Sequence, residues 1–288
     1  MDFVALLMGL CFSIMWSSAF ATGRIIVVDA SPLAVLALRF AISGAIAVTI
    51  ARLRGQSWHL SPAIRRSVLI FGFCQNGLYL GLNFVALQWV EGALASVIAS
   101  AMPLIVAAIG FAQGERLSRL GFGGLVAGFS GVALIMAGRI TQGADVTGVA
   151  LCVIAATALA FATRQVKAVS AGGNLLMVVG LQMLVGSGLL AVAALLVETP
   201  RFHVTPQLVA TLTYQIFIPG LTATMVWFAL VGRVGAIRAS TFHFLNPFFG
   251  VAIAAVLLGE HITVTDVIGV LIAMAGILAV QMARQATR

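Results

Sequence analysis

Polar side chains spaced like one face of a helix, inside otherwise apolar stretches, are the groups of this 288-residue sequence that could do chemistry. Ser240, His243 and Asn246 lie three residues apart and would share a helix face, as would Ser96 and Ser100. His243 could carry a proton near neutral pH or bind a solute, and a packed, hydrogen-bonded histidine explains it equally well. The sequence leaves both roles open.

Similar stripes recur in other apolar stretches. Asn76, Tyr79 and Asn83 occupy positions i, i+3 and i+7, and Gln215 shares a second stripe with Thr211. A polar stripe facing lipid would be costly, so these faces are expected to point inward. Hydrogen bonding between helices explains any single residue, but one shared cavity explains the whole set better. The predicted cavity lining is Trp16, Ser17, Phe20, Arg39, Asn76, Tyr79, Asn83, Ser100, Gln182, Gln215, His243 and Asn246.

Arg39 is the basic residue placed well inside a predicted helix, about 10 Å from its outer end. A charged side chain at that depth faces protein or water, because lipid contact is costly. Arg39 could anchor a substrate carboxylate, or it could bond to carbonyl groups of a neighbouring helix and lock the fold. Amides, hydroxyls and aromatic rings around one arginine suit small neutral or zwitterionic solutes better than phosphates.

The acidic residues exclude most enzyme chemistry. All eight Asp and Glu residues fall in loops or at the ends of apolar stretches. Carboxylates in the membrane core usually carry coupled protons, so this distribution argues against carboxylate-based proton antiport. Motifs of hydrolases and metal sites are missing as well, and we expect no enzyme, no cofactor and no metal. Glu115 and Glu260 are expected to cap the next helix or to pair with basic groups.

The composition indicates which elements must position these groups. With 61% hydrophobic and 8% charged residues, the chain is typical of a polytopic membrane protein. A helix needs roughly 20 apolar residues to cross the bilayer, and continuous apolar runs of that length favour helices. The prediction is an all-α fold of ten transmembrane helices at 3–23, 32–51, 67–88, 92–112, 119–138, 146–166, 174–197, 206–231, 235–258 and 264–283.

Lys and Arg residues orient these ten helices. The side that holds the N-terminus carries twelve basic residues, and the other side carries Arg24, Arg139 and Arg201. Because positive charge stays in the cytoplasm, both termini are predicted to be cytoplasmic. The asymmetry also explains the sequence pI of about 11.0, so no nucleic-acid partner is expected. The expected partners are a small-molecule substrate and the lipid bilayer, with the chain acting as a monomer.

The two halves of the sequence repeat each other. The segment 19–22 returns at 160–163, Pro103 returns at Pro247, and 114–115 returns at 259–260. Five helices per half would turn the second copy upside down, so we predict two inverted repeats, 1–139 and 140–288, that form one transport domain. Pro103 and Pro247 are predicted hinges, although a static bend would serve as well. The repeat pairs Arg39 with Gln182 and Ser100 with His243.

Several of these residues resemble a known family. The segment 16–20, Pro32 leading to Arg39, and the repeated proline and Gly-Glu pattern resemble the EamA-type, ten-helix branch of the drug/metabolite transporter superfamily, across the whole chain. Among its members the chain is most similar to amino-acid exporters of the YddG type. The resemblance implies that family members with different substrates share an arginine at the position of Arg39. This favours a structural role for Arg39 over a role in binding a substrate carboxylate.

The resemblance also implies a function. It implies a transporter of the bacterial inner membrane that exports aromatic or other apolar amino acids, and related small metabolites, by alternating access. Transport would be facilitated, or weakly coupled to protons through His243. A transporter for drugs or nucleotide-type metabolites of the same superfamily is the alternative, and a channel is a further one.

Overall fold

The computed structural model describes residues 3–165 and 174–286, and the described chain consists of helices joined by loops, with one isolated β-bridge between Ala30 and Phe202. Lys167 and Arg288, which contribute to the charge asymmetry, lie outside the described residues. The elements are α1 (Phe3–Asp29), α2 (Pro32–Leu53), α3 (Pro62–Phe71), η1 (Gly72–Tyr79), α4 (Leu80–Ala86), α5 (Gly92–Ser100), α6 (Met102–Ala112), α7 (Arg119–Thr141), α8 (Val146–Gln165), α9 (Leu175–Val197), α10 (Pro206–Gln215), η2 (Ile216–Thr222), α11 (Ala223–Val234), α12 (Ala236–Ser240), η3 (Thr241–Leu245), α13 (Asn246–Leu258) and α14 (Val264–Ala286).

These elements form the ten predicted spans. Nine helical stretches of the described chain are long and apolar enough to cross a membrane, and α8, with its shorter apolar part Val146–Phe161, supplies the tenth. The first helix continues six residues beyond the predicted end at 23. The charged Arg24 is accommodated inside α1, because its guanidinium donates a hydrogen bond to the carbonyl of Leu87 at the end of α4.

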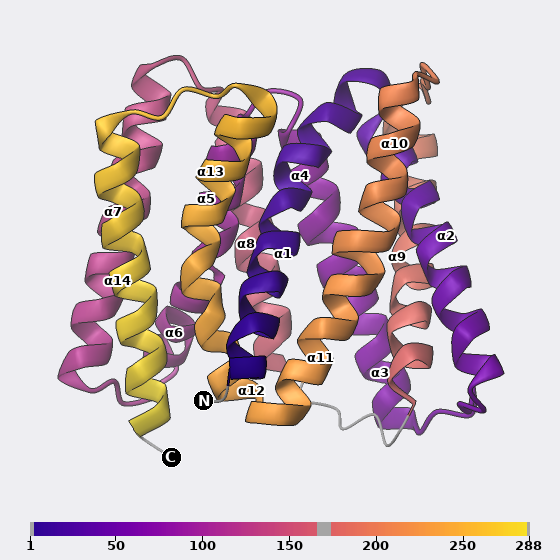
Figure 1. Cartoon of the computed structure of the whole chain (residues 1–288), viewed down its shortest axis with the longest axis horizontal. Coiled ribbons are helices and arrows are strands. Elements are labelled where there is room, and N and C mark those ends of the chain that lie inside the picture. Colours follow the sequence, from indigo (N-terminus) through magenta and orange to yellow (C-terminus); the bar gives the residue numbers. More distant parts are fainter. Residues whose placement is uncertain (1–2, 166–173, 287–288) are drawn as a thin grey trace.

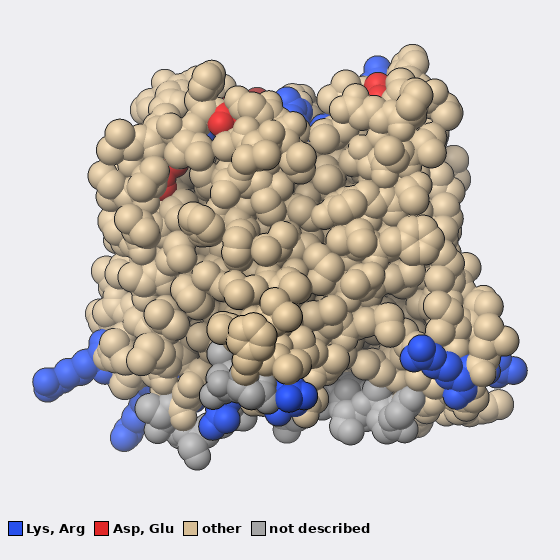
Figure 2. Space-filling view, in the orientation of Figure 1, with Lys and Arg blue, Asp and Glu red and all other residues tan. Residues whose placement is uncertain are grey.

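The second half of the chain is inverted relative to the first. In Figure 1, α1 rises from the lower end of the molecule and α8 descends from the upper end, and both termini lie at the lower end. Figure 2 shows blue Lys and Arg side chains gathered along that lower edge, whereas the red carboxylates on this face lie near the upper edge. The fold is therefore the two-repeat, all-α architecture that the sequence predicts.

Equivalent helices of the two repeats pack against each other at the two sides of the molecule. The pair α7 and α14 forms one side and the pair α2 and α9 forms the other (Figure 1). Glycines allow this approach: a Cβ added to Gly276 would come within 2.2 Å of the Gly128 backbone nitrogen, and one added to Gly44 within 3.0 Å of the Gly180 oxygen. Close backbone packing is what holds helices together where lipid removes the hydrophobic driving force.

Four spans of the described chain are interrupted. In the third and eighth spans, the π-helical segments η1 and η2 occupy equivalent places. In the fourth span, α5 ends at Ser100 and α6 begins one residue before Pro103; in the ninth, the 3-10 segment η3 gives way to α13 just before Pro247. Both prolines thus lie where a helix restarts, as expected of residues that lack a backbone donor. The π segments were not predicted.

Carboxylates cap helices at the upper end. Glu198 accepts hydrogen bonds from two backbone N–H groups at the start of α2, at 2.9 and 3.1 Å. Glu260 accepts from Gly92 and Ala93 at the start of α5, at 2.7 and 2.9 Å. Glu260 therefore does cap a helix, but the helix is α5 and not the following α14. The start of α14 is instead occupied by Asp266.

A buried ion-pair network joins three helices at the same end. Arg139 of α7 donates from Nε and Nη2 to the two carboxylate oxygens of Asp266, at 3.1 and 2.8 Å. Its Nη1 donates to Glu91 at 2.5 Å, and its Nη2 also donates to the carbonyl of His261 at 3.0 Å. Arg139 and Asp266 are both buried, so every nitrogen of this guanidinium is paired inside the protein.

Candidate functional site

The described chain encloses a central cavity near the middle of the membrane spans. Its volume is about 60 Å³, and about 600 Å³ is empty when the open space at its mouth is counted as well. The volume of about 60 Å³ is below the roughly 300–1,000 Å³ typical of small-molecule sites, so a solute of the size of an amino acid requires the walls to move apart. Both halves contribute to its lining, which consists of Trp16, Ala19, Phe20, Arg39, Phe40, Gln75, Asn76, Tyr79, Leu80, Asn83, Phe84, Leu87, Met183, Pro219, Gly220 and Thr224.

The two π segments position part of this lining. η1 presents Gln75, Asn76 and Tyr79, and η2 presents Pro219 and Gly220. A π turn has one residue more than an α turn, so neighbouring residues such as Gln75 and Asn76 can both reach the cavity. Pro219 also lacks the backbone N–H that a regular helix would use at its position. Such irregular turns are frequent at functional sites.

Arg39 lines the cavity from α2, and its surroundings differ from those expected. Its side chain is only 4% exposed. The expected bonds to carbonyl groups are missing at two of its nitrogens: Nε and Nη1 are buried and have no hydrogen-bond partner in the described part of the chain. Its Cζ lies 5.2 Å from the centroid of the Phe40 ring, a contact that leaves the N–H groups unused.

Two asparagines face the cavity from neighbouring turns. Asn76 donates through Nδ2 to the backbone oxygen of Gln182 at 2.9 Å, which ties η1 to α9. Asn83 donates to the backbone oxygen of Tyr79 at 2.7 Å, and its own Oδ1 is buried without a donor among the described residues. Each asparagine thus uses its Nδ2 for a hydrogen bond to a backbone oxygen, Asn76 to the neighbouring α9 and Asn83 to the preceding turn of its own span. The Oδ1 of Asn83 is therefore a hydrogen-bond acceptor that the described residues leave unused and that is covered in this conformation.

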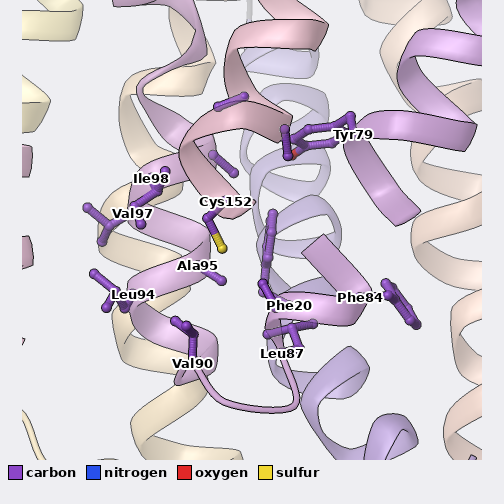
Figure 3. Close-up of a cluster of buried hydrophobic side chains, with 14 of the residues drawn as sticks. Phe20, Tyr79, Phe84, Leu87, Val90, Leu94, Ala95, Val97, Ile98 and Cys152 are labelled. Carbon is purple, nitrogen blue, oxygen red and sulfur yellow. The ribbon is translucent and has the colours of Figure 1, made fainter. Parts of the chain in front are cut away.

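Aromatic and apolar groups complete the wall. Phe20, Tyr79 and Phe84 belong to the buried cluster of Figure 3, where α1, α4 and η1 meet α5 and α8. Tyr79 is 1% exposed, and Cys152 of α8 is buried in the same cluster. This packing fixes one wall of the cavity. Trp16 closes the cavity from the α1 side, with its ring centroid 5.8 Å from that of Phe12.

Six predicted residues lie outside the cavity lining: Ser17, Ser100, Gln182, Gln215, His243 and Asn246. Ser17 and Gln215 donate to backbone oxygens of neighbouring helices, at 3.3 Å to Asn246 and 2.9 Å to Ala19. Ser100 donates to the oxygen of Ser96 one turn earlier, at 2.7 Å. Hydrogen bonding within and between helices therefore accounts for these three.

His243 is also away from the cavity. Its ring stacks on Phe12 at 5.5 Å and lies 5.1 Å from Trp227, so α1 and α11 sandwich it. Its Nδ1 is buried without a partner in the described chain. Residues that the prediction missed include Phe40, Phe84 and Thr224, which line the cavity. Phe40 directly follows the predicted Arg39, and Phe84 directly follows the predicted Asn83. At both places two consecutive residues of a helix line the cavity.

A second hollow adjoins the cavity. It contains about 730 Å³ including open space and is lined by α9, α11 and the loop residues Arg54 and Gln56. Thr224 borders both hollows. Because Arg54 follows α2 at the end of the molecule that holds the termini, the second hollow lies on the side of Thr224 toward that end.

Comparison with known proteins gives a consistent result. The model of the "EamA-like transporter family" matches twice, at residues 3–137 and 146–282. The chain is 25% identical over 270 residues to "Uncharacterized transporter YvbV" of Bacillus subtilis, covering 93% of this chain and 88% of that protein. It is 28% identical over 197 residues to a "Probable amino-acid metabolite efflux pump" of Salmonella typhimurium, covering 64% and 65% of the two chains. A solved structure with 21% identity shares the fold over 100% of both chains, with a TM-score of 0.66.

Proposed function

Because this chain belongs to the EamA-like transporter family, it is a membrane transporter, and we propose that it exports aromatic or other neutral amino acids and related small metabolites. The observation that supports this proposal is the central cavity, which both repeats line with apolar, amide and hydroxyl groups. Such a lining binds small amphipathic solutes by apolar burial with a few polar contacts. The printed name of the Salmonella relative, an amino-acid metabolite efflux pump, points to the same class of substrate.

Alternating access is the proposed mechanism. Two inverted repeats around one cavity allow rocking to expose it to each side in turn. The hollow beside Thr224 would serve as the path to the end that holds the termini, which we place in the cytoplasm of a bacterium, with the protein in the inner membrane as a monomer. The helix restarts at Pro103 and Pro247 would be the hinges.

Transport is proposed to be facilitated. In the described chain, no Asp or Glu lines the cavity, and His243 lies outside its lining. A group that couples protons to substrate must contact the substrate pathway, and intramembrane carboxylates usually do this work. We therefore expect the direction of flux to follow the substrate gradient.

Counterflow in proteoliposomes tests the proposal. Vesicles loaded with unlabelled amino acid should accumulate the same labelled amino acid transiently, with aromatic and branched aliphatic amino acids ahead of nucleotides and sugar phosphates. An imposed pH gradient should change the rate little, and His243→Ala should behave as the wild type does. Accumulation of nucleotides or drugs in place of amino acids would contradict the substrate class. Strong dependence on the pH gradient would contradict facilitated transport, whether or not it survives His243→Ala.

A further inference from the structure

The buried guanidinium of Arg39 lacks the partners that such a group needs inside a protein. Moving a charge out of water is costly, and buried charges are ordinarily paired or saturated with hydrogen bonds. Arg139 is the internal comparison, because it is 5% exposed against 4% for Arg39. Arg139 uses all three of its nitrogens, on Asp266, Glu91 and the His261 carbonyl. Arg39 leaves Nε and Nη1 without partners in the described chain.

The cavity around Arg39 has a net positive charge. Its lining contains this one arginine and no Asp, Glu or Lys among the described residues. Arg39 also lies between the two repeats, since its Nη2 is 3.8 Å from the position that a Cβ of Gly220 would take. A ligand that enters must therefore bring the anionic group itself. A planar guanidinium whose buried N–H groups are not bonded to the protein suits a carboxylate, which it can hold through two parallel hydrogen bonds once the cavity opens to these atoms.

The rest of the lining is matched to the other groups of an amino acid. The buried Oδ1 of Asn83 is an acceptor without a donor in the described chain, and it can receive a hydrogen bond from an ammonium group. Trp16, Phe20 and Phe84 supply aromatic surface for an apolar side chain. An acidic partner for the ammonium is missing from the described lining, so a free amine would meet the repulsion of Arg39 without a carboxylate to offset it.

We infer that Arg39 is the specificity-determining residue of this cavity and that it binds the carboxylate of the substrate. The inference rests on the proposed transport of amino acids and adds which chemical group is required. Solutes with a free carboxylate are accepted, with or without an α-ammonium group. The corresponding amides and amines are rejected.

Competition in the counterflow assay tests this requirement. Labelled phenylalanine is the probe, and phenylalanine amide and 3-phenylpropionate are the competitors, which lack the carboxylate and the ammonium group respectively. In the wild type, the amide should compete at least about tenfold more weakly than phenylalanine, because a hydrogen bond to a charged group is lost. Phenylpropionate should still compete. Leucine and leucine amide repeat the comparison with an aliphatic side chain.

Glutamine variants of the two buried arginines, with Arg39→Lys as a third variant, separate substrate recognition from folding. Arg39→Gln should abolish the preference for phenylalanine over its amide, and Arg39→Lys should restore part of it, because lysine keeps the charge but not the planar fork. The Tm of Arg39→Gln in detergent should equal or exceed that of the wild type, since an unpaired buried charge is removed. Arg139→Gln should lower the Tm and leave the preference unchanged.

The outcomes distinguish the two proposals. Phenylalanine counterflow with equal competition by the amide would overturn the role of Arg39 and leave the transport of amino acids intact. An unchanged preference in folded Arg39→Gln would overturn it as well. Failure of every amino acid to counterflow in wild-type vesicles, with other solutes transported, would overturn the proposed function itself.

Discussion

At the scale of single residues, Glu260 caps a helix, and its burial disfavours the charged form of the capping carboxylate. Its carboxylate accepts two backbone N–H groups at the start of α5, where the helix dipole favours negative charge. Burial nevertheless raises the pKa of Glu260 above its ordinary value of 4.5, and the hydrogen bonds from Ala93 and Gly92 offset this only in part. Ionisation of Glu260 is therefore disfavoured in the folded protein.

The sign of this shift predicts a pH dependence. Because the folded state favours the protonated form, the contribution of Glu260 to folding is fully present below pH 4.5 and declines as the pH rises through the raised pKa. Glu260→Gln cannot ionise and lacks this decline. The Tm of the wild type, relative to Glu260→Gln, should fall as the pH rises above 4.5 and through the raised pKa of Glu260. A difference in Tm that grows with pH would contradict the assignment.

The sequence predicts the chemical types of side chain that line the cavity better than it predicts which individual residues line it. Trp16, Phe20 and Arg39 were predicted to line it, and the structure places them there. Ser17 and Gln215 share their polarity but bond to backbone oxygens of other helices. Periodicity shows that a side chain faces inward. Whether it meets a cavity or a neighbouring helix depends on tertiary packing, which the sequence does not display.

At the scale of elements, two neighbouring glycines of α7 test whether the close packing of α7 on α14, here called the seam, contributes to stability. A Cβ on Gly124 would lie 2.7 Å from the Ala279 Cβ and 2.9 Å from the Gly276 oxygen, whereas one on Gly123 meets nothing within 4 Å. Gly124→Ala should lower the free energy of unfolding by about 1–3 kcal/mol, because the backbones must separate.

Gly123→Ala is the matched control for that substitution. It adds the same methyl group one residue away, and it should change stability by less than about 1 kcal/mol, in the stabilising direction, as alanine replaces glycine in a helix. Thermal unfolding of the two variants in detergent measures the contrast. Equal effects of the two substitutions would show that the close seam is not a determinant of stability.

The elements were predicted in number and type, and their irregularities were not. Ten apolar runs are visible because each must match the thickness of the bilayer. The π segments η1 and η2 leave no such signal, since a pattern of 3.6 residues per turn assumes a regular helix. Pro219 inside η2 is the one residue that could have indicated a disturbance there. The equivalent η1 contains no proline, so only its symmetry with η2 marks it.

At the scale of the whole molecule, the orientation in the membrane remains a prediction from charge. His59, in the loop between α2 and α3, and Gln142, in the loop between α7 and α8, are exposed at opposite ends. In a chain whose three cysteines are replaced, Gln142→Cys should react with an impermeant maleimide on intact cells. His59→Cys should react only after the cells are permeabilised. The reverse pattern would place both termini outside.

The seams between equivalent helices have a consequence for the origin of the chain. α2 packs on α9, and α7 packs on α14, so each seam joins a helix to its own repeat copy. A contact of one surface with its copy is what a two-fold symmetric homodimer makes. Two identical five-helix proteins, inserted in opposite directions, would meet along these same two seams. The architecture is therefore the one that an antiparallel homodimer of five-helix subunits would have, and a single chain allows the first copy to hold Arg39 where the second holds Gln182.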